Sequence, residues 1–104
     1  MNSIRVKVGR NVGTTPLSDT EWGQFQLDVV SIVLDSITDT EGIFDEQIET
    51  VGEWDGDTED SFEYYVTDIK SDINYTRLVS NLKALKTVYK QEAISLTLGQ
   101  GELI

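Results

Sequence analysis

The chain has no cysteine and no histidine, and only one proline among its 104 residues. Without cysteine there is no disulfide and no thiolate nucleophile. Without histidine there is no imidazole for proton transfer near neutral pH, and typical zinc sites are excluded. The sequence also lacks both a run of about eighteen apolar residues and the basic-then-apolar start of a secretion signal. We therefore expect a protein without a cofactor, located in the cytoplasm, or inside the host cell if its source is viral.

Basic residues are missing from a long central stretch. Between Arg10 and Lys70 the chain carries sixteen carboxylates and no lysine or arginine, whereas both flanks are mildly basic. The formal net charge is −11 and the pI is near 4.1. Such a charge argues against direct binding to nucleic acids and anionic membranes, which are polyanions. A strongly acidic field instead favours partners with a basic surface.

Length and apolar content indicate one compact domain spanning residues 1–104. Apolar residues make up 38% of the chain, and its nine aromatic residues are spread from Trp22 to Tyr89. A chain of this size can bury one hydrophobic core but is too short for two.

The N-terminal part reads as a strand followed by a helix. Residues 4–8 alternate apolar and polar side chains, which predicts a strand with one buried face. Ser18 and Glu21 have the spacing of a capping box, which predicts a helix start. The apolar stripe that follows repeats every three or four residues and predicts a helix ending near Ser36. This stripe consists of Trp22, Phe25, Val29, Ile32 and Val33.

Residues 41–68 lose the helical spacing and become rich in β-branched and aromatic types, which predicts two antiparallel strands. The Asp55-Gly56-Asp57 segment is a good turn signal, because Asp and Gly tolerate the positive φ of tight hairpins. Gly52 predicts a bulge or a close approach of another backbone. On the strand after the turn, we expect Phe62, Tyr64 and Val66 to face the core.

A second helix and a last strand complete the pattern. Asp72 or Asn74 can cap a helix in which Leu78, Leu82, Leu85 and Tyr89 form the buried stripe, widened by Val88. Residues 93–98 alternate again and predict a strand. The order β-α-β-β-α-β predicts an α+β, ferredoxin-like fold, a four-stranded antiparallel sheet with two helices on one face and the second and fourth strands at its edges.

Four short motifs follow one another along the chain: VKVGR from Val6, SDTEWGQF from Ser18, GEW from Gly52 and YKQEAI from Tyr89. They resemble the motifs of a domain family of unknown function found in small bacterial and phage proteins. In the last motif Tyr89 and Gln91 are only two residues apart, which departs from the family's longer spacing. The resemblance implies the α+β fold and no particular activity.

Two charged clusters are candidate sites. Arg5, Lys7 and Arg10, close to two glycines, are a candidate anion or nucleotide pocket, although Arg5 and Lys7 can equally be outward strand residues that offset carboxylates across the sheet. The second cluster is a candidate protein-interaction surface. Its residues are Asp45, Glu46, Glu49, Glu53, Asp55, Asp57, Glu59 and Asp60. A calcium loop at the hairpin tip is disfavoured, because Asp60 and Val66 stand where an EF-hand needs Gly and Glu.

Three functions remain open. The first is a noncatalytic acidic inhibitor, from a phage or mobile element, that binds a basic host protein as a nucleic-acid mimic would. The second is a small-ligand or nucleotide sponge that uses the Arg5, Lys7 and Arg10 cluster. The third, less favoured without histidine, is a dimeric α+β barrel enzyme, with Glu92 as the first carboxylate to inspect. A homodimer through the uncovered sheet face fits all three; the residues predicted on that face are Thr50, Tyr65, Thr67, Ser95 and Thr97.

Overall fold

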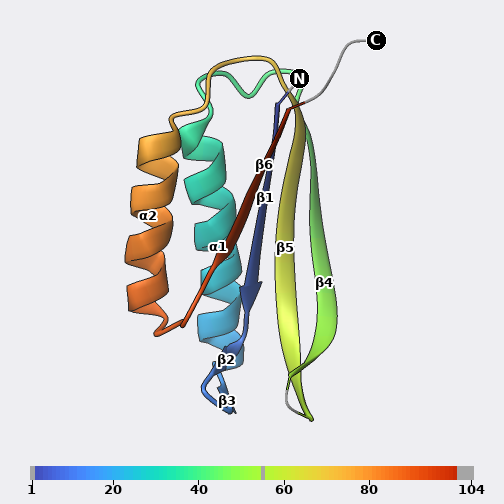
Figure 1. The fold of residues 1–104 in the computed structure, drawn as a ribbon, viewed down its shortest axis with the longest axis vertical. Coiled ribbons are helices and arrows are strands. Elements are labelled where there is room, and N and C mark those ends of the chain that lie inside the picture. The colour runs from blue at the N-terminus through green and yellow to red at the C-terminus, as the bar shows by residue number, and fades with distance from the viewer. Residues whose placement is uncertain (1, 55, 101–104) are drawn as a thin grey trace.

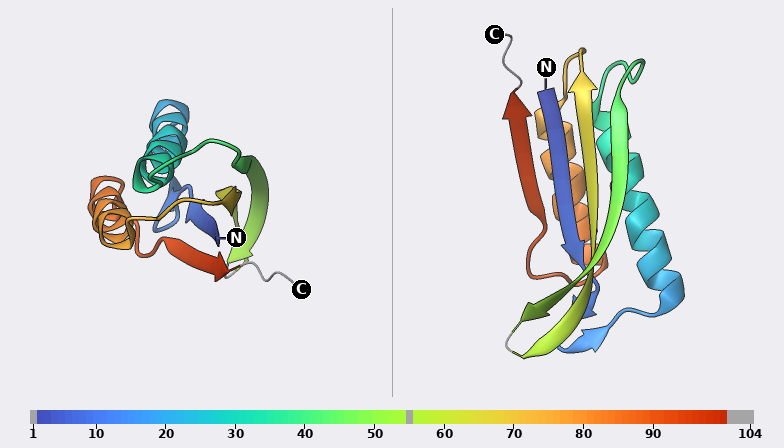
Figure 2. Two further views of the ribbon diagram at one scale, coloured as in Figure 1. Left: turned by 90° about the horizontal axis from the view of Figure 1, so that it is seen from above. Right: turned by 90° about the vertical axis from the view of Figure 1, so that its right-hand side faces the viewer.

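The computed structural model describes residues 2–54 and 56–100, which form one sheet covered on one side by two helices (Figures 1 and 2). The elements are β1 (Asn2–Gly9), β2 (Asn11–Val12), β3 (Thr15–Pro16), α1 (Asp19–Ser36), β4 (Phe44–Trp54), β5 (Asp57–Ile69), α2 (Tyr75–Val88) and β6 (Ser95–Gln100). The four-stranded sheet has the order β4-β5-β1-β6, and each neighbouring pair is antiparallel. This arrangement confirms the predicted ferredoxin-like fold, with β4 and β6 at the sheet edges.

The core lies between the sheet and the helices. The apolar residues of β1 and β5 that alternate toward the helices are fully or nearly fully buried, as are the predicted stripes of both helices apart from the half-buried Ile32 and the exposed Val88. Phe25 of α1 stacks on Tyr89 with ring centroids 4.3 Å apart, and Trp22 meets the edge of Phe25 at 5.9 Å. Aromatic contacts of this kind add to the stabilisation from buried area. They join α1 to the end of α2.

Side chains cap the N-termini of both helices, as the sequence predicts. The N–H of Glu21 donates to Ser18 Oγ over 3.2 Å, and the N–H of Ser18 donates to Glu21 Oε1 over 3.4 Å. At α2, Asn74 is the cap, because its Oδ1 accepts the N–H of Arg77 over 3.1 Å. Each contact satisfies a backbone donor that the first helical turn leaves free.

The β4–β5 hairpin corrects one expectation. Its register is continuous from Phe44 opposite Thr67 to Trp54 opposite Asp57, so there is no bulge at Gly52. The alternative, a close approach of another backbone, is not seen either, because a Cβ added at Gly52 would lie 4.0 Å from Glu59 O, an ordinary contact. The tip does contain a turn with positive φ, at Gly56, where φ is +82°.

Two other features differ from the sequence pattern. Residues 11–16, for which the sequence pattern predicts no element, form the small β2–β3 hairpin, whose turn contains Gly13 with φ of +61°. Val88 does not widen the buried stripe of α2, since 68% of its surface is exposed. The helix turns this residue away from α1 and the sheet.

Within the described residues, neither α1 nor α2 combines the length and apolar character needed to cross a lipid bilayer.

Candidate functional site

Arg10, one of the three predicted anion-binding cations, is held by groups of the protein. Its Nε donates to the carbonyl oxygen of Leu17 over 2.8 Å, and its two terminal nitrogens contact Asp19 over 2.7 Å and Asp60 over 3.2 Å. These contacts, led by the hydrogen bond to Asp19, raise the pKa of Arg10 above its usual value. Arg10 therefore ties the loop after β1 to the start of α1 and to β5.

Arg5 and Lys7 lie apart from Arg10, on the face of the sheet that the helices leave uncovered. Arg5 Nε contacts Glu63 over 2.9 Å, and its guanidinium lies 4.3 Å from the centre of the Tyr65 ring. Lys7 shares this face because it alternates with the buried Val6 and Val8. The structure thus brings Arg5 and Lys7 together and places Arg10 elsewhere, so the three cations do not converge on one pocket.

Three residues of the predicted acidic surface have internal partners. Glu59 accepts the N–H of Asn11 over 2.8 Å and lies against Gly9, where an added Cβ would collide with its carboxylate. Asp60 pairs with Arg10. Asp45 accepts the hydroxyl of Tyr64 over 2.7 Å. These carboxylates hold the fold together, which leaves them less available to a partner.

Other members of that surface are exposed along β4. Glu46, Glu49 and Glu53 are exposed, and none of them takes part in an ion pair within the described part of the chain. Asp55 lies outside the described residues, and Asp57 is described only as the first position of β5. Over residues 2–54 and 56–100, no cluster of three or more acidic side chains is arranged to hold a metal ion.

Tyrosine hydroxyls bind carboxylates at the margin of the core. The Tyr64 hydroxyl contacts Asp45, and the Tyr89 hydroxyl donates to Asp28 over 2.8 Å. Burial, followed by the hydrogen bond to a negative group, raises the pKa of Tyr64 well above its usual value and that of Tyr89 to about 12. Both hydroxyls stay protonated at neutral pH and act as donors.

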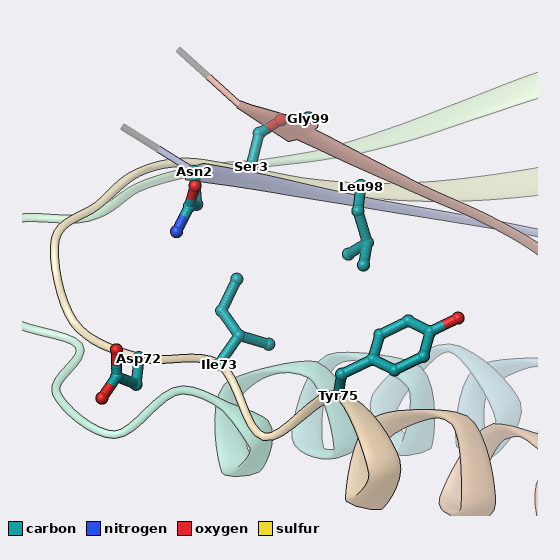
Figure 3. Close-up of a pocket in the computed structure, with 7 residues that line it drawn as sticks. All are labelled: Asn2, Ser3, Asp72, Ile73, Tyr75, Leu98 and Gly99. Carbon is teal, nitrogen blue, oxygen red and sulfur yellow. The ribbon is translucent and has the colours of Figure 1, made fainter.

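A hollow of about 370 Å³ opens where α2 begins beside the ends of β1 and β6 (Figure 3). Figure 3 shows Ile73 and Leu98 pointing toward one another across it, with the Tyr75 ring next to Leu98 and the Asn2 side chain turned inward. The ring of Tyr75 is 54% exposed and Leu98 is 44% exposed, so the apolar wall is open to solvent. Asp72 lies at the rim, and Ser3 and Gly99 complete the lining.

The groups around this hollow suit a nucleoside-sized ligand. Its volume falls in the range of about 300–1,000 Å³ common for small-molecule sites, which combine apolar walls with a few polar groups. An aromatic ring offers a stacking surface for a base, and a carboxylate accepts hydrogen bonds from a ribose or attracts a cation. Among the described residues, the lining holds no lysine or arginine for a phosphate. The arrangement therefore favours an uncharged or cationic nucleoside over a nucleotide.

Sequence reasoning missed this hollow. The sequence pattern gives Asp72 only a role as a helix cap and gives Tyr75 no role. The hollow is lined by residues 2–3, 72–73, 75 and 98–99, which are far apart along the chain. The one local signal was an aromatic residue at the start of α2 that falls outside the buried stripe.

The residues predicted for the uncovered sheet face lie on that face, on the strands β4, β5 and β6. Tyr65, Thr67, Ser95 and Thr97 alternate with residues that face the helices, and Thr50 has the same alternation on β4. Glu92 lies in the loop before β6, beside α2, and does not line the hollow of Figure 3.

Comparison with known proteins yields solved structures only: no protein-family model and no curated protein matches this chain. A phage SAM (S-adenosylmethionine) lyase in complex with S-methyl-5'-thioadenosine aligns over 95% of this chain and 80% of its own, with 21% identity and a TM-score of 0.54. The same kind of enzyme in its apo state aligns over 94% and 78%, with 20% identity and a TM-score of 0.57. At this identity the likeness shows a shared fold.

Proposed function

We propose that this chain is a phage protein that binds S-adenosylmethionine in the hollow at the start of α2 and releases S-methyl-5'-thioadenosine from it. The observation that carries this proposal is the hollow itself, in which an exposed aromatic residue, apolar side chains and the Asp72 carboxylate surround a space of nucleoside size. Among the described residues, Asp72 takes part in no ion pair. The phage lyase of the same fold supplies the ligand class. Tyr75 would stack on the adenine, and Asp72 would attract the positively charged part of the substrate.

The charge of the chain supports this ligand. S-adenosylmethionine carries a sulfonium and is a net cation at neutral pH, and a chain with net charge −11 concentrates cations near its surface. The same charge repels nucleotides, which are anions.

The proposed reaction also does not require the residue types that the chain lacks. Release of S-methyl-5'-thioadenosine breaks the bond between the sulfonium sulfur and the γ-carbon of the amino-acid part, and the electron pair of that bond stays on sulfur, so the leaving group is a neutral thioether. The substrate's own carboxylate oxygen forms the new bond to that carbon and closes a five-membered lactone, so no proton has to be transferred. A good leaving group of this kind needs a positioned substrate more than a strong base. A chain without cysteine and histidine can meet that requirement.

The test is to incubate the purified chain with S-adenosylmethionine and measure S-methyl-5'-thioadenosine by liquid chromatography, with calorimetric binding of the product as a second readout. We expect Tyr75→Ala and Asp72→Asn each to weaken binding by about tenfold or more, since a stacking ring or a charged hydrogen bond contributes about 1–3 kcal/mol. Val88→Ala is the matched control, because Val88 is exposed on the same helix and does not line the hollow.

Absence of both product formation and heat of binding would overturn the proposal. If Tyr75→Ala and Asp72→Asn bind the product as strongly as the control Val88→Ala, the assignment of the site would be overturned, because the ligand would then be held elsewhere.

A second candidate function is that of a noncatalytic acidic inhibitor that binds a basic host protein. It is favoured by one observation: Glu46, Glu49 and Glu53 are exposed on the edge strand β4 and lie outside the ion pairs of the described chain. Unpaired charges at a surface steer a partner of opposite sign and accelerate association.

This candidate is tested by affinity capture from a host lysate at low salt, with Glu46→Lys compared with Glu41→Lys. Both residues are exposed and both changes add the same charge, but Glu41 lies before β4. We expect the basic protein to be lost with Glu46→Lys alone and to dissociate as salt rises. A captured protein that is retained equally by both variants would contradict a role for β4.

A further inference from the structure

An apolar groove runs between α2 and β6, at the opposite edge of the sheet from β4. It has a volume of about 230 Å³, and its apolar lining consists of Val79, Leu82, Ala93, Ile94 and Leu96. Its charged lining consists of Lys83, Lys86 and Glu92, so the groove is basic by one charge in an otherwise acidic molecule. Among the strands that the structure describes, β6 pairs only with β1, so its outer edge is free for another strand.

The other edge of the sheet has complementary features. Val51 of β4 is 67% exposed, and Glu49 and Glu53 stand two residues before and after it. Side chains at alternate positions of a strand share a face, so these three residues lie together. Glu49 is opposite the buried Phe62 in the register of β4 and β5, which places this face on the same side of the sheet as the helices.

We propose that two copies of this chain associate head to tail, with β4 of one copy lying along the free edge of β6 in the next. Val51 of the first copy enters the groove of the second, and its Glu49 and Glu53 face Lys83 and Lys86 there. The contact pairs an exposed apolar residue with an apolar groove and pairs carboxylates with ammonium groups.

The strand directions permit this contact. Each neighbouring pair of the sheet is antiparallel, so β4 and β6 at its two ends run in opposite directions. A second copy in the same orientation would therefore add its β4 antiparallel to β6. Leu96 is opposite the buried Val6 and so faces the helices, like Val51 on β4. The joined strands thus bring apolar residues to the same side of a continuous sheet.

We favour a second copy of this chain over a different protein as the partner that binds the groove between α2 and β6, because the chain itself carries both complementary edges. A head-to-tail contact uses two different surfaces of each copy, so it builds a closed ring or an open chain and not a two-fold dimer. This inference does not depend on the nucleoside hollow, since none of the residues that it uses lines that hollow.

Charge reversal tests the proposal, with the mass of the full chain measured by light scattering and sedimentation over a range of concentrations. We expect the wild type to form assemblies larger than a monomer. Lys83→Glu with Lys86→Glu should weaken association by about tenfold or more, and Glu49→Lys with Glu53→Lys should do the same, since each tenfold step corresponds to about 1.4 kcal/mol. A chain with all four reversals should regain association, which would also show that the reversed residues do not prevent folding.

Val51→Ser should weaken association as well, and Phe44→Ser is its control, because Phe44 is 56% exposed on the same strand but on the opposite face. A wild-type chain that stays monomeric at millimolar concentration would overturn the proposal and would leave β4 to a different protein. Failure of the four reversals to restore association that either pair alone had removed would overturn it too.

Discussion

Two tyrosine hydroxyls connect the apolar core to the acidic surface. Tyr64 and Tyr89 are buried, and each donates its hydroxyl to a carboxylate, Asp45 and Asp28 respectively. A buried hydroxyl without a partner would cost about 1–3 kcal/mol, so these carboxylates stabilise the fold. Part of the negative charge of the chain therefore has a structural role.

The Tyr89 hydroxyl predicts how stability depends on alkaline pH. Its pKa rises from the usual value near 10 to about 12 in the folded chain, so its contribution is fully present below about pH 10 and is lost as the pH rises through 12. We expect the free energy of unfolding to fall less steeply between pH 10 and pH 12 in Tyr89→Phe than in the wild type. Urea unfolding at several pH values measures this slope. Tyr75→Phe, at an exposed tyrosine, should keep the wild-type slope; equal slopes in all three proteins would contradict the prediction.

The periodicity of apolar residues predicted that the Tyr64 and Tyr89 side chains are buried, but it did not predict which groups their hydroxyls would bind. Tyr64 and Tyr89 fall on predicted buried stripes, and both are buried. Their partners come from other elements, β4 for Tyr64 and α1 for Tyr89. A hydrogen bond between two elements depends on their packing, which no single stretch of sequence encodes. The same limit explains why Arg10, grouped with Arg5 and Lys7 by proximity in sequence, is bound by Asp19 and Asp60 instead.

At the start of α1, the reciprocal contacts of Ser18 and Glu21 satisfy backbone donors that would otherwise be free. We expect Ser18→Ala to lower the free energy of unfolding by about 1 kcal/mol, the usual effect of losing an N-terminal cap. Chemical denaturation measures the change. Thr20→Ala is the control, since Thr20 is exposed in the same helical turn and is not the cap. A loss of equal size in both variants would show that the cap does not stabilise α1.

The order of the long elements could be predicted because each has many residues with a clear period. The two helices and the central strands β1 and β5 contain several buried positions at regular spacing, and the helix starts follow caps. The edge strands β4 and β6 have no buried position among the residues whose burial is described, so they were predicted from alternation and residue type alone. The β2–β3 hairpin could not be found in this way, because strands of two residues have no period. The hollow near Tyr75 could not be predicted from the sequence either, because it forms only when β1, β6 and the start of α2 meet.

Over the whole molecule, the acidic block separates into two groups of carboxylates. Those of α1 and of the β5 end of the hairpin are mostly bound by internal partners: Asp19 and Asp60 by Arg10, Asp28 by Tyr89, and Asp35 by Arg77. Those exposed on β4 have no such ion pairs among the described residues. The sequence shows an acidic block between two mildly basic flanks. It could not show that the unpaired charges gather on one edge strand, because that depends on which carboxylates meet a cation or a hydroxyl.

The position of β1 has a consequence for how this protein is made in the cell. β1 precedes the other described elements in the sequence, yet it lies between β5 and β6, and its partners extend to Gln100. On the ribosome, β1 can therefore pair both of its edges only after β5 and β6 have been synthesised. Until then both edges of β1 are unpaired, and its alternating Arg5 and Lys7 give it the charge that discourages premature pairing with other nascent chains.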